Sequence, residues 1–398
     1  MRQLGTTLIA ACVVSCTPPS SEQAVDTAVA DRLMETGRYR EAAAAYGEAA
    51  ALHSHSAPVH ARLARACAAS EDLGAAVRAY RQAVSLDSSD VISRAEMAVL
   101  LVRLDRFPEA YDALHEALRV DPGYAWAHNI LGQLHGREGK YDEAVASYRR
   151  AVAAVPDYGE AWYNLGQVHL KQRETEAARE AFTQAVGADT TDGRFYSGLG
   201  AVHLKLRQYG EAAAVLEEAV RLQPLLARAH FNLGNAYMRL GREEEGRREL
   251  ETFRQLEDQE RRITSLETTI LQDPGRAGLY HNLALIHGQR GEFGKARERY
   301  LQAIARDPNY APSYHNLGNI QLRHGLTREA MGFYRRALRA DSSYVPAYRS
   351  LGNTYMMQGA YEAALRIYRQ GLEFEPDNEA LRERAGLAAQ AVQARSSR

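Results

Sequence analysis

The sequence predicts an all-α solenoid, an array of repeated helix pairs, and three observations support this prediction. A small residue recurs every 34 residues, which is the length of one supersecondary unit copied along the chain. Each unit carries two apolar stripes with helical spacing. The composition, 45% hydrophobic with 12 prolines among 398 residues, is that of a folded chain that tolerates helices.

The 34-residue period is carried by alanine and is interrupted once. The series begins with Ala42, Ala76, Ala110, Ala144, Ala178 and Ala212. Gly246 takes the next step, and Ala296, Ala330 and Ala364 resume the series after a gap of 50 residues. Because 50 is one period plus 16 residues, the gap predicts an insertion of about half a repeat.

Residues 159–190 illustrate the two helices of a unit. One face of the first helix carries Trp162, Leu165, Gly166 and His169, which lie three or four residues apart. After a polar turn near residues 172–175, a second helix carries Ala178, Phe182 and Ala185. Neither helix can bury its apolar face alone, so we expect each to stack on its neighbours.

Glycines at matched positions predict close approach between the two helices of a unit. They are Gly132, Gly166, Gly200, Gly234, Gly318 and Gly352. Each costs about 1 kcal/mol relative to alanine inside a helix, so their recurrence indicates a packing requirement. Aromatic residues are expected to fill the complementary space: Tyr46, Tyr80, Tyr148, Phe182, Tyr300, Tyr334 and Tyr368.

These recurring positions resemble the tetratricopeptide repeat (TPR) family over most of the chain. The resemblance implies antiparallel helix pairs that wind into a right-handed superhelix with a concave groove, in about ten units. It places repeats 1–7 at residues 25–258 and repeats 8–10 at residues 275–376. Residues 377–398 are expected to form a capping helix and a tail.

Residues 259–274 form the insertion and depart from the repeat pattern. No proline occurs between 243 and 272, and a helical apolar stripe continues through Leu250, Phe253, Leu256, Ile263, Leu266 and Ile270. We expect one long second helix of about 45 Å, at 1.5 Å per residue, with or without a kink near Asp258. The alternative is a break in the helix, and either arrangement predicts a hinge or a flat site between two sub-arrays.

Residues 1–15 resemble a bacterial lipoprotein signal peptide. Arg2 precedes an apolar stretch that is too short to span a bilayer as a mature helix. This stretch ends in Val13-Val14-Ser15-Cys16, which resembles a lipobox, so Cys16 is expected to be lipidated and residues 16–24 to form a tether. Cys12 matches the pattern with a shorter apolar segment, and an ordinary secretory signal is a further alternative.

The resemblance also implies a location. In bacteria with two membranes, an aspartate after the lipidated cysteine retains a lipoprotein at the inner membrane, and Thr17 occupies that position here. We therefore expect a lipid-anchored protein of the cell envelope, at the outer membrane and facing the periplasm. Only Cys67 remains after processing, so no intramolecular disulfide is expected.

Two series of polar residues are candidates for binding a partner in the groove. The cations follow the histidine position of the first helix by two residues: Arg103, Arg137, Lys171, Lys205, Arg239 and Arg323. The amides occupy two nearby positions: Asn164, Asn232, Asn235, Asn282, Asn316, Asn319 and Asn353. Amides pair with any peptide backbone and cations favour carboxylates, so a protein or peptide partner is expected. The alternative is that both series serve solubility or helix–helix contacts.

The sequence gives little support for a catalytic, cofactor, metal or nucleic-acid site. The sequence contains no G-x-x-x-x-G-K-[ST] loop, no G-x-S-x-G elbow and no C-x-x-C pair, so no catalytic activity and no cofactor are expected. His135, His169, His203 and His287 recur at one repeat position, where packing is expected rather than a metal site. A net charge of −1 favours neither nucleic acid nor an anionic membrane surface.

We therefore expect a non-catalytic adaptor lipoprotein that binds a partner polypeptide and organises an envelope assembly. The alternative is a structural spacer or a self-associating array without a specific peptide ligand. The sequence does not predict the oligomeric state.

Overall fold

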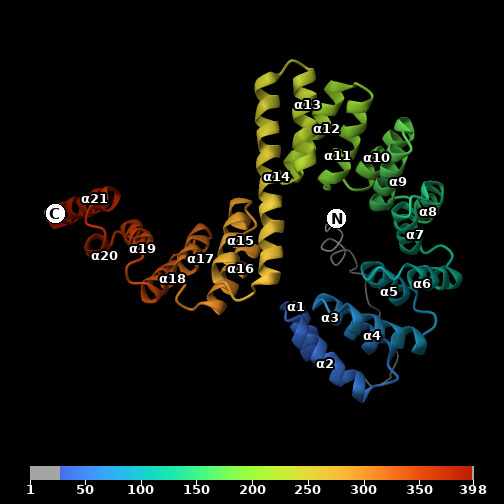
Figure 1. The fold of residues 1–398 in the computed structure, drawn as a ribbon, viewed down its shortest axis with the longest axis horizontal. Coiled ribbons are helices and arrows are strands. Elements are labelled where there is room, and N and C mark those ends of the chain that lie inside the picture. Colours follow the sequence, from blue (N-terminus) through green and yellow to red (C-terminus); the bar gives the residue numbers. More distant parts are fainter. Residues whose placement is uncertain (1–26, 397–398) are drawn as a thin grey trace. The chain divides into compact units, whose positions relative to one another are not determined.

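The computed structural model describes residues 27–396, which contain 21 helices arranged as ten antiparallel pairs and a final single helix. The all-α fold, the paired helices and the C-terminal helix predicted from the sequence are thus confirmed. The chain divides into two compact units, one up to Gln223 and the other from Pro224 (Figure 1). In each pair the odd-numbered helix is here called the first helix and the even-numbered one the second helix.

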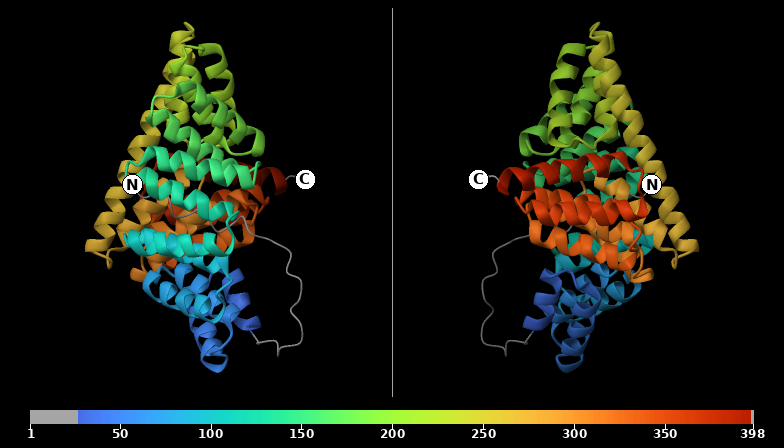
Figure 2. Two further views of the ribbon diagram at one scale, coloured as in Figure 1. Left: turned by 90° about the vertical axis from the view of Figure 1, so that its right-hand side faces the viewer. Right: turned by 90° about the vertical axis from the view of Figure 1, so that its left-hand side faces the viewer.

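The N-terminal unit comprises six pairs. Their bounds are α1 (Ala28–Glu35), α2 (Tyr39–Leu52), α3 (Ala57–Ala69), α4 (Leu73–Leu86), α5 (Val91–Arg103), α6 (Phe107–Val120), α7 (Ala125–Arg137), α8 (Tyr141–Ala154), α9 (Gly159–Lys171), α10 (Thr175–Ala188), α11 (Gly193–Lys205) and α12 (Tyr209–Leu222). Figure 2 shows the blue-to-green helices of this unit as successive layers. Helices of this unit that follow one another in the chain pack together, and alanines are prominent among the residues that they bury.

The C-terminal unit comprises four pairs and the last helix. Their bounds are α13 (Ala227–Arg239), α14 (Glu243–Gln272), α15 (Ala277–Gln289), α16 (Phe293–Arg306), α17 (Ala311–Arg323), α18 (Thr327–Ala340), α19 (Val345–Met357), α20 (Tyr361–Phe374) and α21 (Glu379–Ser396). Helix α21 packs on α20 and buries Leu381 and Ala388, so it covers the apolar face of the last pair.

The glycines of the first helices face a large side chain of the second helix in the same pair. A Cβ atom added to Gly132 would lie 2.6 Å from the ring of Tyr148, and one added to Gly318 would lie 2.5 Å from the ring of Tyr334. The close approach predicted from the glycine series is therefore between a first-helix backbone and a second-helix side chain. These aromatic side chains are almost fully buried.

A second recurring contact explains a position that varies widely in sequence. The fourth residue of the first helix reaches back to the carbonyl oxygen six residues earlier, in the turn that precedes the helix. Histidine, tryptophan, tyrosine and arginine all make this bond, at His60, Arg94, His128, Trp162, His230, Tyr280 and Tyr348. What the position requires is a long side chain with a terminal polar group, because that group completes the hydrogen bonding of the turn.

The turn inside each pair uses one residue in the left-handed region of backbone conformation. Glycine occupies this place in six pairs, for example Gly139 with φ +77°. Four pairs use a residue with a side chain, such as Arg173 with φ +63°. A left-handed residue ends the first helix and reverses the chain, so the second helix can begin two residues later, after one intervening residue.

Helix α14 continues without interruption from Glu243 to Gln272, which is the single long second helix favoured by the sequence. Its first half pairs with α13. Its second half packs Ile263, Leu266 and Ile270 on α15. Phe253 occupies a position where other second helices carry alanine or glycine. The centroid of its ring lies 5.1 Å from that of the Phe231 ring on α13.

Two buried histidines join first helices within the C-terminal unit. Nδ1 of His281 lies 3.0 Å from the hydroxyl of Ser313, and Nε2 of His315 lies 2.9 Å from that of Ser350. Each ring also packs between two tyrosine rings. Burial lowers the pKa of both rings to about 4, since it disfavours the charged imidazolium.

We expect Gly318→Ala to destabilise the C-terminal unit, because the added methyl overlaps Tyr334. The cost of such overpacking is about 1–3 kcal/mol. Thermal unfolding followed by circular dichroism should show a lower midpoint for the C-terminal unit. The matched control is Gly332→Ala on α18, where no atom lies within 4 Å and alanine should raise stability slightly. Equal midpoints for both variants would contradict the packing account.

We expect acid to destabilise the protein through His281 and His315. Their folded pKa of about 4 lies below the value of about 6.5 for an unfolded histidine, so the unfolded state binds more protons between these pH values. The free energy of unfolding therefore falls as the pH drops from 6.5 towards 4, by up to roughly 3 kcal/mol for each ring.

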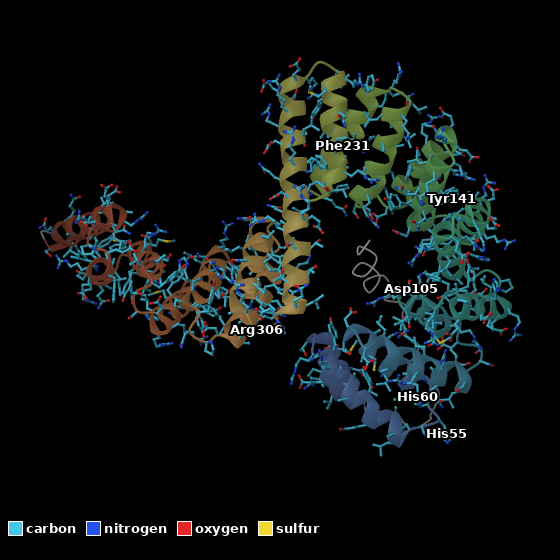
Figure 3. The ribbon with its side chains drawn as sticks, viewed as in Figure 1. His55, His60, Asp105, Tyr141, Phe231 and Arg306 are labelled. Atoms are coloured by element: carbon cyan, nitrogen blue, oxygen red, sulfur yellow. The ribbon has the colours of Figure 1, made fainter. Side chains whose placement is uncertain are left out.

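Thermal unfolding between pH 7 and pH 4.5 tests this expectation. The double variant His281→Gln, His315→Gln should lose less stability over that range than the original protein. His55→Gln is the control, because His55 lies exposed in the turn between α2 and α3 (Figure 3). If the double variant and the control show the same pH dependence, the two rings do not carry the effect.

Candidate peptide-binding surface

The first helices form the inner side of the N-terminal unit. Successive first helices contact one another, α5 with α7, α7 with α9 and α9 with α11, more extensively than successive second helices do. In the C-terminal unit, side chains join α15 to α17, α17 to α19, and α19 to α21. We call the surface formed by the odd-numbered helices of a unit its first-helix face, and each unit has one of its own.

Four of the six predicted cations contact the preceding repeat, two of them through ion pairs. Nη2 of Arg103 lies 2.6 Å from Oε2 of Glu71, and Nη2 of Arg137 lies 3.6 Å from Oδ1 of Asp105. Arg137 also lies over the ring of Phe107, with 5.1 Å to its centroid. Arg103 and Arg137 thus each contact the turn inside the preceding helix pair. A shallow depression surrounds Arg137, lined also by Asp105, Phe107, Leu134 and Glu138.

Two further cations stack on the first residue of the preceding second helix. Lys171 lies over Tyr141 at 5.5 Å and Arg323 over Phe293 at 5.4 Å. Lys205 and Arg239 are exposed. Four of the six cations therefore make contacts between repeats, which is the alternative role that the sequence left open. An exposed cation that stacks on an aromatic ring still has N–H donors available for a ligand.

Several of the predicted amides also have hydrogen-bond partners within the protein. Nδ2 of Asn164 donates to Oδ1 of Asn129 at 3.1 Å, and Nδ2 of Asn319 donates to Oδ1 of Asn316 at 3.3 Å. Asn282 is exposed, and Asn232 and Asn235 are partly exposed. The C-terminal unit contains six of the seven predicted amides.

Tyrosine hydroxyls of the second helices reach the first-helix face, a role that the sequence analysis missed. Tyr334 donates to Oδ1 of Asn319 at 2.9 Å and Tyr368 donates to Oδ1 of Asn353 at 2.7 Å. Burial raises the pKa of Tyr334 to about 12, so its hydroxyl stays protonated at neutral pH. The sequence signal is a tyrosine fifteen residues after a polar side chain of the first helix.

In the N-terminal unit, tyrosines at the same repeat position donate hydrogen bonds to carboxylates. Tyr46 donates to Asp31, and Tyr80 donates to Oε2 of Glu96 at 2.6 Å. These carboxylates pair with arginines of α3: Arg62 lies 3.4 Å from Asp31, and Arg65 lies 2.9 Å from Glu96. Such partly exposed pairs add little stability, but they neutralise the charge of this part of the face.

The first-helix face of the C-terminal unit has a different charge. Helices α13, α15, α17 and α19 contain no aspartate or glutamate, whereas they carry several arginines. One of these is Arg349, which is exposed on α19 and which the sequence analysis did not single out. Arg384 on α21 was also missed, and its Nη1 donates to Oδ1 of Asn353 at 2.8 Å. The lack of acidic residues in these four helices was readable from the sequence.

The recurring histidines each have a hydrogen-bond partner. Nδ1 of His169 lies 2.6 Å from Glu174, that of His203 lies 2.7 Å from Gln208, and that of His287 lies 2.9 Å from Glu292. His135 contacts the hydroxyl of Tyr111. Within residues 27–396 no group of histidine, cysteine and acidic side chains is arranged to hold a metal ion.

The predicted anchor lies outside the described residues, as do Cys16, the alternative Cys12 and the tether. Cys67, the one cysteine that the structure describes, is buried and unpaired. None of the helices between residues 27 and 396 combines the length and apolarity needed to cross a bilayer.

Sequence profiles described as tetratricopeptide repeats match residues 28–91, 131–193, 198–252 and 321–390. A profile described as a TPR repeat matches residues 286–325. Together these matches cover well over half of the chain. A search of curated proteins found no match.

The fold is also similar to solved structures. For pilF of Pseudomonas aeruginosa the identity is 18% and the TM-score 0.45, over 48% of this chain and 88% of that chain. For PilW, described as a widely conserved type IV pilus biogenesis factor, the values are 20% and 0.43, over 48% and 90%. For YrrB, described as a TPR protein with an unusual peptide-binding site, they are 22% and 0.32, over 51% and 97%.

Repeat profiles match most of the chain, and the structure pairs antiparallel helices with the same 34-residue period. The chain therefore belongs to the tetratricopeptide repeat family, whose members are generally non-catalytic and bind peptide partners.

Proposed function

We propose that this protein is a non-catalytic adaptor that holds a partner polypeptide on its first-helix faces. The observation that supports this most is that polar side chains of these faces are held in place before any partner binds. Tyr334 and Tyr368 orient two amides, and aromatic rings support Arg137, Lys171 and Arg323. Preorganised side chains lose little conformational freedom on binding, so many weak contacts along a face can add up to useful affinity.

We further propose that the adaptor is a lipid-anchored protein of the cell envelope, tethered through Cys16 at the outer membrane and facing the periplasm. The lipobox-like Val13-Val14-Ser15-Cys16 and Thr17 support this proposal. Anchoring the array would raise the local concentration of partners at the membrane, and so help to organise an envelope assembly.

The alternative function is a structural spacer or a self-associating array. The observation that favours it is the inter-repeat pairing of the cations, such as Arg103 with Glu71 and Arg137 with Asp105. Cations that serve only to stiffen the stack would leave partner binding unchanged when they are neutralised. The two functions therefore differ in one measurable outcome.

Neutralising four cations of the first helices should weaken capture of the partner. In the variant Arg137→Gln, Lys171→Gln, Lys205→Gln, Arg239→Gln, the aliphatic parts of the side chains remain while the charges are lost. We expect about tenfold less partner in affinity capture from the envelope, and weaker capture by the original protein as salt rises.

The matched control neutralises four exposed arginines of the second helices: Arg119, Arg150, Arg179 and Arg221. It changes the net charge by the same amount on the opposite side of the helix pairs. Equal capture by both variants and the original protein, together with self-association at micromolar concentration, would favour the spacer instead.

Replacing the predicted lipidation site should release the protein from the membrane. In Cys16→Ser no thiol remains at that position, so labelling with a radioactive fatty acid should disappear and the protein should leave the membrane fraction. Cys12→Ser is the matched control and should keep both properties. Lipid labelling that survives in Cys16→Ser and is lost in Cys12→Ser would move the anchor to Cys12.

A further inference from the structure

The pair formed by α13 and the first half of α14 exposes apolar side chains of a kind that the other pairs bury. Phe231 and Met238 on α13 are 42% and 40% exposed, and Leu250 and Phe253 on α14 are partly exposed. In the other second helices that the structure describes, the residues equivalent to Leu250 and Phe253 are all buried. We call these four residues the α13–α14 apolar surface.

The four side chains form one continuous surface. Phe231 and Met238 lie seven residues apart on one side of α13, and Leu250 and Phe253 lie three apart on one side of α14. The phenylalanine rings are in contact, with 5.1 Å between their centroids. A Cβ atom added to Gly246 would lie 2.8 Å from Sδ of Met238, so this methionine also packs on α14.

The insertion in α14 explains why this surface is exposed. In a regular stack the next first helix covers this side of a pair. Here the next first helix, α15, packs on the second half of α14, where Leu283 and Ile286 contact Ile263 (Figure 1). Arg290, one residue beyond α15, lies 2.8 Å from Glu260 near the middle of α14. A helix of thirteen residues is about 20 Å long, so α15 covers only half of the 45 Å of α14.

The regular pairs show what kind of helix covers this side. In the pair α7–α8, the counterparts of Leu250 and Phe253 are Tyr148 and Ala151. Tyr148 packs with Leu165 and Val168 of the next first helix, α9, and Ala151 packs with Ala161 of the same helix. The covering helix thus presents a small residue, a leucine four residues later and an aliphatic residue three residues after that.

Phe253 restricts which helix can dock on α14. It occupies the position of an alanine or glycine in the other second helices. Its ring therefore takes up space beside the small residue of a covering helix. Only glycine or alanine fits at that point, because a larger side chain would overlap the ring.

We propose that the α13–α14 apolar surface docks an amphipathic helix of a partner protein, with a small residue, a leucine and an aliphatic residue at spacings of four and three. Apolar burial drives such docking, and the small residue sets its register. In a second copy of this chain, the described first helices bury this pattern inside their own stack, as α9 does with Ala161, Leu165 and Val168, so the helix has to come from another protein.

This inference goes beyond the proposed function. The docked segment is a helix and not an extended chain, and the surface uses neither the cations nor the amides of the first-helix faces. The two can therefore be tested separately.

Two labelled helical peptides serve as probes for the whole chain. The first has the sequence of residues 159–171, which carries the pattern as Ala161, Leu165 and Val168. Glutamate at position 163 and lysine at position 167 replace the native residues and are joined by an amide bond, which keeps the peptide helical on the side opposite the pattern. The second probe also carries Ala161→Leu. Fluorescence anisotropy measures their binding.

We expect the alanine probe to bind saturably and at least about tenfold more tightly than the leucine probe. In the protein, Phe231→Ser, Met238→Ser should weaken binding of the alanine probe about tenfold, because apolar contact area is lost. Phe253→Ala should reverse the preference between the probes, since removing the ring opens the space that a leucine needs.

The matched control is Leu326→Ser, Met357→Ser. It removes the same number of exposed apolar side chains from the same unit, at α18 and α19, and should bind the alanine probe like the original protein. Circular dichroism should show equal helix content for the two serine variants, so that a loss of binding reports on the surface and not on folding.

Three results would overturn the docking site: no saturable binding of the alanine probe, unchanged binding in Phe231→Ser, Met238→Ser, or the same probe preference in Phe253→Ala as in the original protein. A dimer at micromolar concentration that Phe231→Ser, Met238→Ser abolishes would also overturn it, because the occupant would then be a second copy. None of these results bears on the first-helix cations, whose role depends on capture of the envelope partner.

Discussion

The structure depends on one steric fit, repeated in each pair: a small residue of the first helix lies against a large residue of the second. At Gly318 and Tyr334 the backbone and the ring are so close that no Cβ atom fits between them. This approach lets the two helices bury their apolar faces together, and it sets the distance at which the next pair stacks. Because the contact is local to each pair, the chain can be extended by adding pairs, and no single core has to accommodate them.

The large side chains of this steric fit also place polar groups at the surface. A tyrosine such as Tyr368 fills the space beside Gly352 with its ring, and its hydroxyl emerges on the first-helix face, where it holds Asn353. Packing and polar preorganisation therefore come from one side chain. Phenylalanine or leucine at this position, as in Phe182 and Leu216, preserves the packing without that polar group. The pairs of this protein are thus alike in architecture and different in surface chemistry.

The first-helix faces of the two units differ in the pairing of their charged side chains. In the N-terminal unit, Asp31 and Glu96 pair with arginines of α3, so part of the face is neutralised internally. In the C-terminal unit the first helices of the pairs have no acidic residue, and Arg349 forms no ion pair with another residue of the stretch 27–396. Helix α14 adds a further difference, since it is much longer than the other second helices and carries Phe253 at a position where they have alanine or glycine.

The sequence by itself determined the repeat length, the pairing of helices, the long α14 and the capping helix, because each of these follows from apolar periodicity and small residues along the chain. It also identified the cation and amide series. Only the tertiary structure decided what those side chains contact. Arg137 contacts Asp105 and Phe107 of the preceding pair. Tyr368 and Arg384 donate hydrogen bonds to the amide oxygen of Asn353 and so fix its orientation. Such contacts join residues up to 32 positions apart across stacked helices, and periodicity places a side chain on a face without specifying its partner there.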